Sequence, residues 1–133
     1  MTILITIILL LIAATHALWG LGIWFPVRTE ESLAHAVVGA KGVSRMPGPI
    51  PCFLVVAALG IVIAALWMPP WAIRSAILWI AVVMFFLRGL IPYLKIWRRL
   101  ASEEPFASYD RKYYGPLCLA LGAGLAFVTL GVA

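Results

Sequence analysis

Four long apolar runs, more than any other feature, limit what this chain can fold into. Each run is long enough to cross a bilayer as a helix, which takes about 20 consecutive apolar residues. The 133 residues are 65% hydrophobic and 11% charged, whereas soluble domains carry about 45–50% apolar and about 25% charged residues. A small soluble fold cannot cover that much apolar surface. The sequence therefore predicts an all-α integral membrane protein and excludes a soluble enzyme, a disordered chain and a disulfide scaffold. The expected four-transmembrane-helix bundle is one membrane domain over residues 1–133, with spans at about 3–25, 52–68, 71–94 and 115–132.

The first run is expected to be an uncleaved transmembrane helix rather than a signal peptide. No Lys or Arg precedes its apolar core, and Thr15-His16-Ala17 is a poor cleavage site. The run continues through Trp24 and Phe25 to Pro26, which is expected to end the helix.

The first loop carries the signals of a short helix. Thr29 is a favourable N-cap, and the two glutamates that follow it suit the positive end of a helix dipole. A short interfacial helix is therefore expected over Ser32–Val38, with Gly39 ending it. The run from Met46 to Pro51 contains three prolines and is expected to be extended.

Turn signals separate the later spans. Pro69-Pro70 lies between the second and third runs and allows only a tight hairpin. These two spans are therefore expected to be antiparallel neighbours. A polar loop is expected between the third and fourth spans, up to Tyr114.

Lys and Arg are divided unequally between the two sides that four spans would create. One side carries only Arg74, and the other carries eight basic residues on short loops. Because basic loops stay in the cytoplasm, both long loops are expected there, with both termini on the outer, periplasmic side of the inner membrane. The net charge of +5 then favours anionic membrane lipids as partners, and no nucleic-acid partner is expected. The eight basic residues are Arg28, Lys41, Arg45, Lys95, Arg98, Arg99, Arg111 and Lys112.

The cysteines and histidines form no metal or redox pattern. Cys52 and Cys118 lie far apart and outside any CxxC motif. The topology puts both at cytoplasmic ends of spans, where the compartment is reducing, so no structural disulfide is expected. His16 and His35 are the only histidines, so no metal site is predicted, and the sequence indicates no particular cofactor.

His16 is the first candidate for a functional group inside the membrane. It lies about 15 Å from the cytoplasmic end of the first span at 1.5 Å per residue, and an ionisable group at that depth suggests a function. One interpretation is a proton relay, a headgroup contact or a cofactor ligand. The other is a neutral imidazole bonded to Thr15, to a backbone carbonyl or to a neighbouring helix.

Arg88 is the stronger candidate, because guanidinium keeps its charge inside the membrane. It follows the apolar run that begins at Val83. Its side chain either extends to the membrane surface or meets a buried acid. Asp110, just before the fourth span, is the expected partner, through a direct bidentate contact or one water.

Small residues recur at helical spacing on the first and fourth spans, where they favour close packing against neighbouring helices. An alternative is that they line a cavity for a lipid. The residues are Ala13, Ala17 and Gly20 on the first span and Gly115, Cys118, Gly122, Ala126 and Thr129 on the fourth.

Three short motifs carry a family resemblance. They are His16-x-x-Trp19-Gly20, Arg88-Gly89, and the run from Pro105 to Cys118 with its Asp-Arg pair and Pro-Leu-Cys end. Together they resemble domain of unknown function 3995, a family of small bacterial four-helix membrane proteins. Gly115 stands where that family is expected to have Ser. The resemblance implies four spans in a bacterial inner membrane and implies no reaction.

Three functions remain open from the sequence. The favoured one is a non-enzymatic binder of a lipid or small apolar molecule, or an accessory subunit for a partner chain. The alternative is a membrane enzyme acting on a lipid or isoprenoid at the cytoplasmic interface, with His16 and Asp110 as catalytic candidates. The third is a homo-oligomeric transporter or channel. The ligand-binding candidates are His16, Trp19, Arg88, Asp110, Arg111 and Tyr114.

Overall fold

The protein is built from helices joined by loops. The computed structural model describes residues 1–132, and that part of the chain contains no strand, which confirms the all-α prediction. The elements are α1 (Thr2–Gly20), α2 (Glu30–Val37), α3 (Pro49–Trp67), α4 (Ala72–Leu90), the 3₁₀ turn η1 (Ile91–Tyr93), α5 (Lys95–Leu100), α6 (Phe106–Tyr109), the π-helical turn η2 (Asp110–Tyr114) and α7 (Gly115–Thr129).

Three segments are long and apolar enough to cross a membrane. They are Thr2–Gly20, Pro49–Trp67 and Ala72–Tyr93, the last combining α4 and η1. The fourth helix, α7, has 15 residues and is shorter than the roughly 17–25 residues of a typical spanning helix. It continues without a break from α6 and η2, so helical backbone extends beyond α7 itself.

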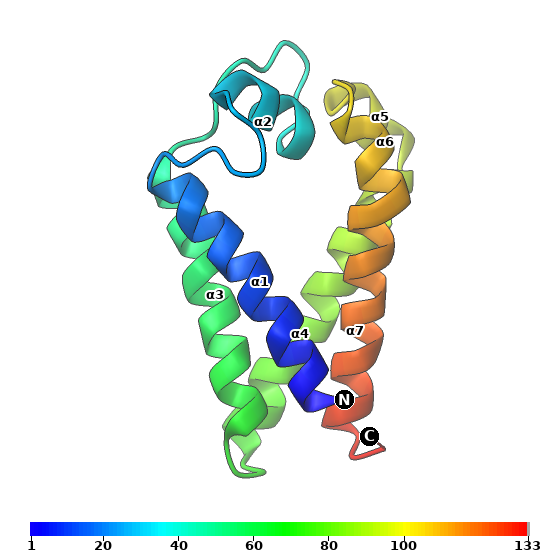
Figure 1. Ribbon diagram of the computed structural model, residues 1–133. Helices are drawn as coiled ribbons and strands as arrows, with labels where there is room; N and C mark the ends of the chain where they lie inside the picture. The colour runs from blue at the N-terminus through cyan, green and yellow to red at the C-terminus, as the bar shows by residue number, and fades with distance from the viewer. Residues whose placement is uncertain (133) are drawn as a thin grey trace.

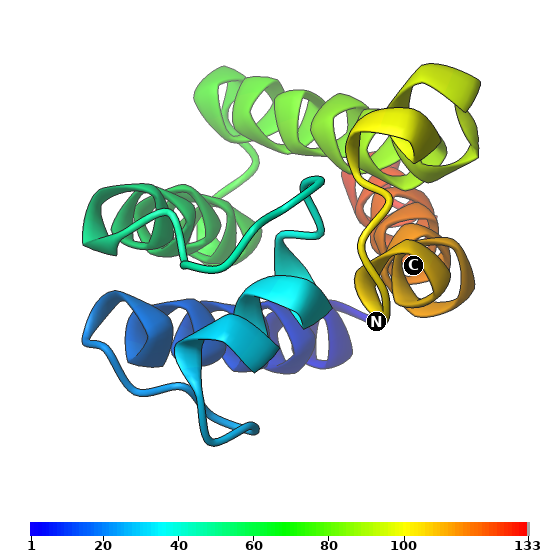
Figure 2. The ribbon, with the colours of Figure 1, turned by 90° about the horizontal axis from the view of Figure 1, so that it is seen from above.

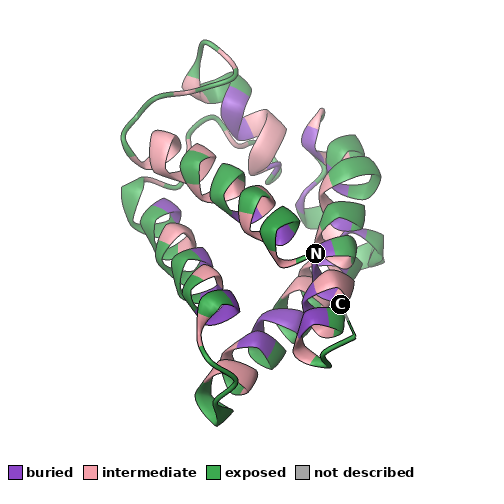
Figure 3. Cartoon of the chain, turned by 60° about the horizontal axis from the view of Figure 1, so that its bottom comes forward, coloured by how far each residue is buried: buried purple, intermediate pink, exposed green. Residues whose placement is uncertain are grey.

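The long helices form two pairs that meet at one end and diverge at the other. Helix α1 packs along α3, and α4 packs along α7 (Figures 1 and 2). The pairs meet near the α3–α4 hairpin, and there the apolar core is buried (Figure 3). Leu9 of α1, Leu78 of α4 and Leu125 of α7 are all fully buried in this core.

The predicted hairpin is confirmed. Helix α3 ends at Trp67 and α4 begins at Ala72, with Pro69-Pro70 between them. Met1 and the end of α7 lie at this same end of the molecule, and both long loops lie at the other end (Figure 1).

The two long loops pack on each other above the diverging helix pairs. Leu33 and Ala34 of α2 are buried, as is Phe106 of α6. The amide of Lys41 donates to the carbonyl of Leu100 at 3.1 Å. These contacts tie the α1–α3 pair to the α4–α7 pair at the end where the long helices have separated.

The first helix ends earlier than predicted. Helix α1 stops at Gly20 rather than near Pro26. Gly22 has a φ of +79°, a left-handed conformation that favours glycine and ends helices. The amide of Ile23 then donates back to the carbonyl of Leu18 at 2.9 Å, which caps the helix before the proline.

Two segments predicted as loops are helical. The extended prediction for Met46–Pro51 is wrong over its second half, because α3 begins at Pro49. Prolines in a first helical turn cost no internal hydrogen bond. The prediction of a polar loop up to Tyr114 is also wrong over its last part, because α6 and η2 are helical and lead directly into α7.

The short helix predicted in the first loop is confirmed, and it begins two residues earlier than predicted. Helix α2 covers Glu30–Val37, and the Thr29 hydroxyl accepts a hydrogen bond from the Ser32 amide at 3.2 Å. The N-cap that the sequence predicted is therefore present.

Glycines allow α4 and α7 to approach closely. A Cβ added at Gly89 of α4 would lie 2.6 Å from Leu119 Cγ and 3.0 Å from the Gly115 carbonyl oxygen. A Cβ at Gly122 of α7 would lie 3.2 Å from the Phe86 ring. The packing interpretation of the small residues is therefore confirmed at Gly115 and Gly122, which are both buried.

Candidate functional site

The predicted contact between Arg88 and Asp110 is present. Arg88 Nη2 lies 2.6 Å from Asp110 Oδ1, and only 2% of the Asp110 side chain is exposed. The expectation of a bidentate pair is wrong, because Trp97 Nε1 donates to the second carboxylate oxygen at 2.9 Å. Asp110 is thus held by one charged and one neutral donor.

The local structure of two helices brings these groups together. Arg88 lies in the last turn of α4, and Asp110 begins the π-helical turn before α7. The Gly115 amide donates to the Asp110 carbonyl five residues earlier, and such π turns are frequent at functional sites. The neighbouring Gly89 removes the side chain that would separate α4 from α7.

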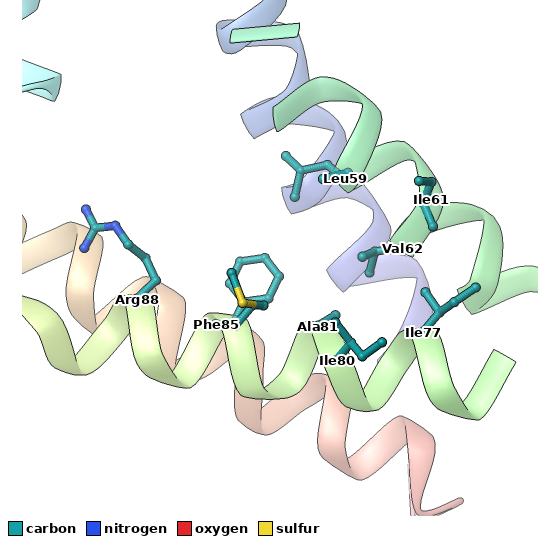
Figure 4. A pocket seen from close by; sticks show the side chains of 10 residues that line it. Leu59, Ile61, Val62, Ile77, Ile80, Ala81, Phe85 and Arg88 are labelled. Atoms are coloured by element: carbon teal, nitrogen blue, oxygen red, sulfur yellow. The ribbon is translucent and has the colours of Figure 1, made fainter. Parts of the chain in front are cut away.

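Arg88 also lies at one end of an apolar groove between α3 and α4. The groove has a volume of about 490 Å³, and Figure 4 shows side chains of the two helices facing each other across it. Arg88 Nη1 is buried and has no hydrogen-bond partner within the described residues. The other lining residues are Ala58, Leu59, Ile61, Val62, Ile77, Ile80, Ala81, Met84 and Phe85.

His16 and Trp19 form a separate pair on α1. The ring centroids lie 4.8 Å apart, and His16 Nδ1 donates to the Ile12 carbonyl at 2.8 Å, one of the bonds expected for a neutral imidazole. Trp19 Nε1 donates to the Phe25 carbonyl at 2.7 Å. Over residues 1–132 no hydrogen bond joins His16 to Arg88 or Asp110, so the six candidates do not form one cluster.

Tyr114 and Arg111 extend the site toward the loops. The Tyr114 hydroxyl donates to the Ala36 carbonyl in the first loop at 3.0 Å. The Arg111 side chain is exposed and lines a second, basic pocket.

Trp97 is a member of the site that the sequence analysis missed. It stands between Ile96 and Arg98 in a basic segment, which is where an ordinary interfacial tryptophan is expected. A half-buried indole N–H needs an acceptor. The chain has only five Asp and Glu residues, so few side-chain carboxylates could accept from this indole. That scarcity is the sequence signal that could have pointed to Asp110 as the acceptor.

The thiols and the metal-binding residue types give no further site. Cys52 and Cys118 are both free, as expected. Within residues 1–132 no three His, Cys, Asp or Glu side chains gather where a metal ion could bind. The absence of a bound metal in the functional protein stays a prediction.

Comparison with known proteins supports the family resemblance. No curated protein and no solved structure matches the chain. The profile of the family described as "Protein of unknown function (DUF3995)" matches residues 9–125. That range contains the His16, Arg88 and Asp110 motifs and most of the 133 residues. The chain therefore belongs to the DUF3995 family.

Proposed function

We propose that this protein binds an amphipathic membrane molecule without transforming it. The apolar chain of that molecule lies in the groove between α3 and α4, and its anionic head, a phosphate or carboxylate, accepts a hydrogen bond from Arg88. The protein carries out this binding in the inner membrane of a bacterium.

The buried and unpartnered Nη1 of Arg88 at the end of an apolar groove is the observation that carries this proposal. A buried donor without an acceptor costs about 1–3 kcal/mol, so an acceptor at this position stabilises the protein. Asp110 is occupied by Nη2 and by Trp97. An anionic head would supply the missing acceptor for Nη1. An attached apolar chain would fill the groove, because the other nine residues that line it are apolar.

Filling the groove is expected to remove the ligand. Ala58 is exposed on α3 and lines the groove. We expect Ala58→Trp to lower the amount of copurifying lipid-like ligand by about tenfold, equivalent to about 1.4 kcal/mol. Native mass spectrometry of the gently extracted protein measures the retained ligand, and also reports any homo-oligomer or partner subunit.

Ala57→Trp is the matched control for this experiment. Ala57 is exposed and adjacent on α3 but does not line the groove. The control should retain as much ligand as the unmodified protein. Equal ligand loss in both variants, or undiminished ligand in Ala58→Trp, rejects the groove as the binding site.

We also propose that α7, extended by η2, forms a fourth span, with both long loops in the cytoplasm and both termini in the periplasm. The two long loops lie at the opposite end from Met1 (Figure 1). The unequal division of basic residues supports the cytoplasmic assignment of the loops.

Single cysteines introduced in a background lacking Cys52 and Cys118 test this topology. In intact cells, a membrane-impermeant maleimide should label Val132→Cys. Lys41→Cys in the first long loop and Ser102→Cys in the second, both exposed, should stay unlabelled until the cells are permeabilised. The reverse pattern refutes the orientation, and labelling of Val132→Cys only after permeabilisation refutes the fourth span.

A further inference from the structure

Four basic side chains line one pocket at the loop end of the molecule. Lys95, Arg98 and Arg99 come from α5 and Arg111 from η2, and the pocket has a volume of about 290 Å³. Lys95 and Arg99 are four residues apart on one helix, a spacing at which like charges destabilise the helix. The Tyr93 hydroxyl donates to the Arg111 carbonyl at 2.9 Å, which holds η2 beside the segment leading into α5. The fold therefore holds four positively charged side chains around one pocket despite the repulsion between them.

The acids of the described residues do not neutralise this basic pocket. The one ion pair over residues 1–132 joins Arg88 to Asp110, and none of the four lining residues is acidic. The nearby glutamates are engaged elsewhere. Glu103 accepts from the Gly42 amide, and Glu104 accepts from the amide and the hydroxyl of Ser108. The four cations are exposed and meet no acid of the described residues, so they are free to bind an external anion.

The surroundings of the basic pocket indicate that the anion belongs to a lipid. Ile96 and Leu100 of the same helix are 68% and 62% exposed, and they are four residues apart on one face. Helix α5 directly follows the apolar segment Ala72–Tyr93. Apolar and basic faces on one short helix at the end of a spanning segment are typical of the membrane interface.

We propose that the basic pocket binds a membrane lipid whose headgroup is a phosphomonoester. Such a group carries about −1.5 to −2 charges and three strong acceptor oxygens at neutral pH, whereas a phosphodiester headgroup carries a single negative charge. Four cations that line one pocket favour the more highly charged group. The basic pocket shares no lining residue with the groove between α3 and α4, so this site does not depend on the proposed function.

The test compares two lipids at equal total negative charge. Detergent-purified full-length protein is mixed with detergent–phosphatidylcholine mixed micelles that contain either phosphatidic acid or phosphatidylglycerol, and bound lipids are counted by native mass spectrometry. We expect about tenfold more retained phosphatidic acid, which corresponds to about 1.4 kcal/mol. The exposed double variant Arg98→Gln/Arg99→Gln should abolish this preference. Equal retention of the two lipids by the unmodified protein overturns the proposal.

Two further arms separate this pocket from surface charge and from the groove. Arg28→Gln/Arg45→Gln removes the same charge from exposed positions outside the basic pocket and should keep the preference for phosphatidic acid. If this variant loses the preference equally, the preference comes from surface charge in general, and the site is refuted. Ala58→Trp should also keep the preference; its loss would place phosphatidic acid in the groove instead. Inorganic phosphate at equal concentration should displace little phosphatidic acid, and full displacement would show a site for a free ion.

Discussion

Replacing Arg88 with alanine is expected to lower the free energy of unfolding by about 1–3 kcal/mol, the cost of leaving a buried polar group short of a hydrogen-bond donor. The loss is smaller than for a fully buried ion pair because the Arg88 side chain is 38% exposed. Asp110 is 2% exposed, and the variant leaves its carboxylate with only the Trp97 indole as donor. Reversible unfolding of the detergent-solubilised protein by increasing denaturing detergent measures the change.

Three variants decide whether the ion pair causes that loss. Arg28 is exposed, so Arg28→Ala should change stability by less than about 0.5 kcal/mol. Arg88→Met with Asp110→Asn removes both charges and should be more stable than Arg88→Ala alone. Arg88→Lys should lose less than Arg88→Ala, because the ion pair is a single Nη2–Oδ1 contact that an ammonium can partly replace. An Arg88→Ala protein as stable as Arg28→Ala would show that the side chain extends to the membrane surface without using Asp110.

Replacing Gly89 with leucine is expected to cost about 3 kcal/mol, the upper end of the usual cost of overpacking. Its Cβ alone would lie 2.6 Å from Leu119 Cγ and 3.0 Å from a backbone oxygen of Gly115. The side chain of Leu119 can move, but the backbone of α7 can yield only if the two helices separate. Separation would also pull Asp110 away from Arg88. The same unfolding titration measures the loss.

Gly60→Leu is the matched control for helix packing. Gly60 lies within α3, and nothing stands within 4 Å of a Cβ added there. Its replacement should leave stability unchanged or slightly raised, because glycine within a helix costs about 0.5–1 kcal/mol relative to alanine. Equal losses at Gly89 and Gly60 would contradict a specific role for the α4–α7 contact.

The elements that could be predicted from the sequence are those that depend on local chemistry. Apolar runs, the Thr29 cap and the Pro69-Pro70 hairpin act within a few residues, and all three appear in the structure. Helix ends were harder to predict. Pro26 was a plausible end for α1, but Gly22 ends the helix first, and the start of α3 at Pro49 shows how well a first turn accepts proline.

The contact between Arg88 and Asp110 was predictable because a charge inside a membrane segment needs a partner and this chain offers few acids. The hydrogen-bond donor to the second carboxylate oxygen of Asp110 was not predictable. Trp97 reaches it only because η1 ends α4 and α5 turns the chain so that the indole meets the π-helical turn. Three separate segments must be placed in space before that hydrogen bond exists.

The sequence by itself determined a helical membrane protein, its hairpin and its central ion pair, because hydropathy, capping and charge burial are properties of short segments and of composition. Only the tertiary structure decided that the two helix pairs meet at one end and diverge at the other (Figure 1). The groove between α3 and α4 and the packed loops follow from that arrangement, whereas the basic pocket forms between α5 and η2 on the α4–α7 side alone. Its physical cause is the uneven distribution of contacts between helices. Buried leucines hold the pairs together near the hairpin, and close packing at Gly89 holds α7 to α4 rather than to α1.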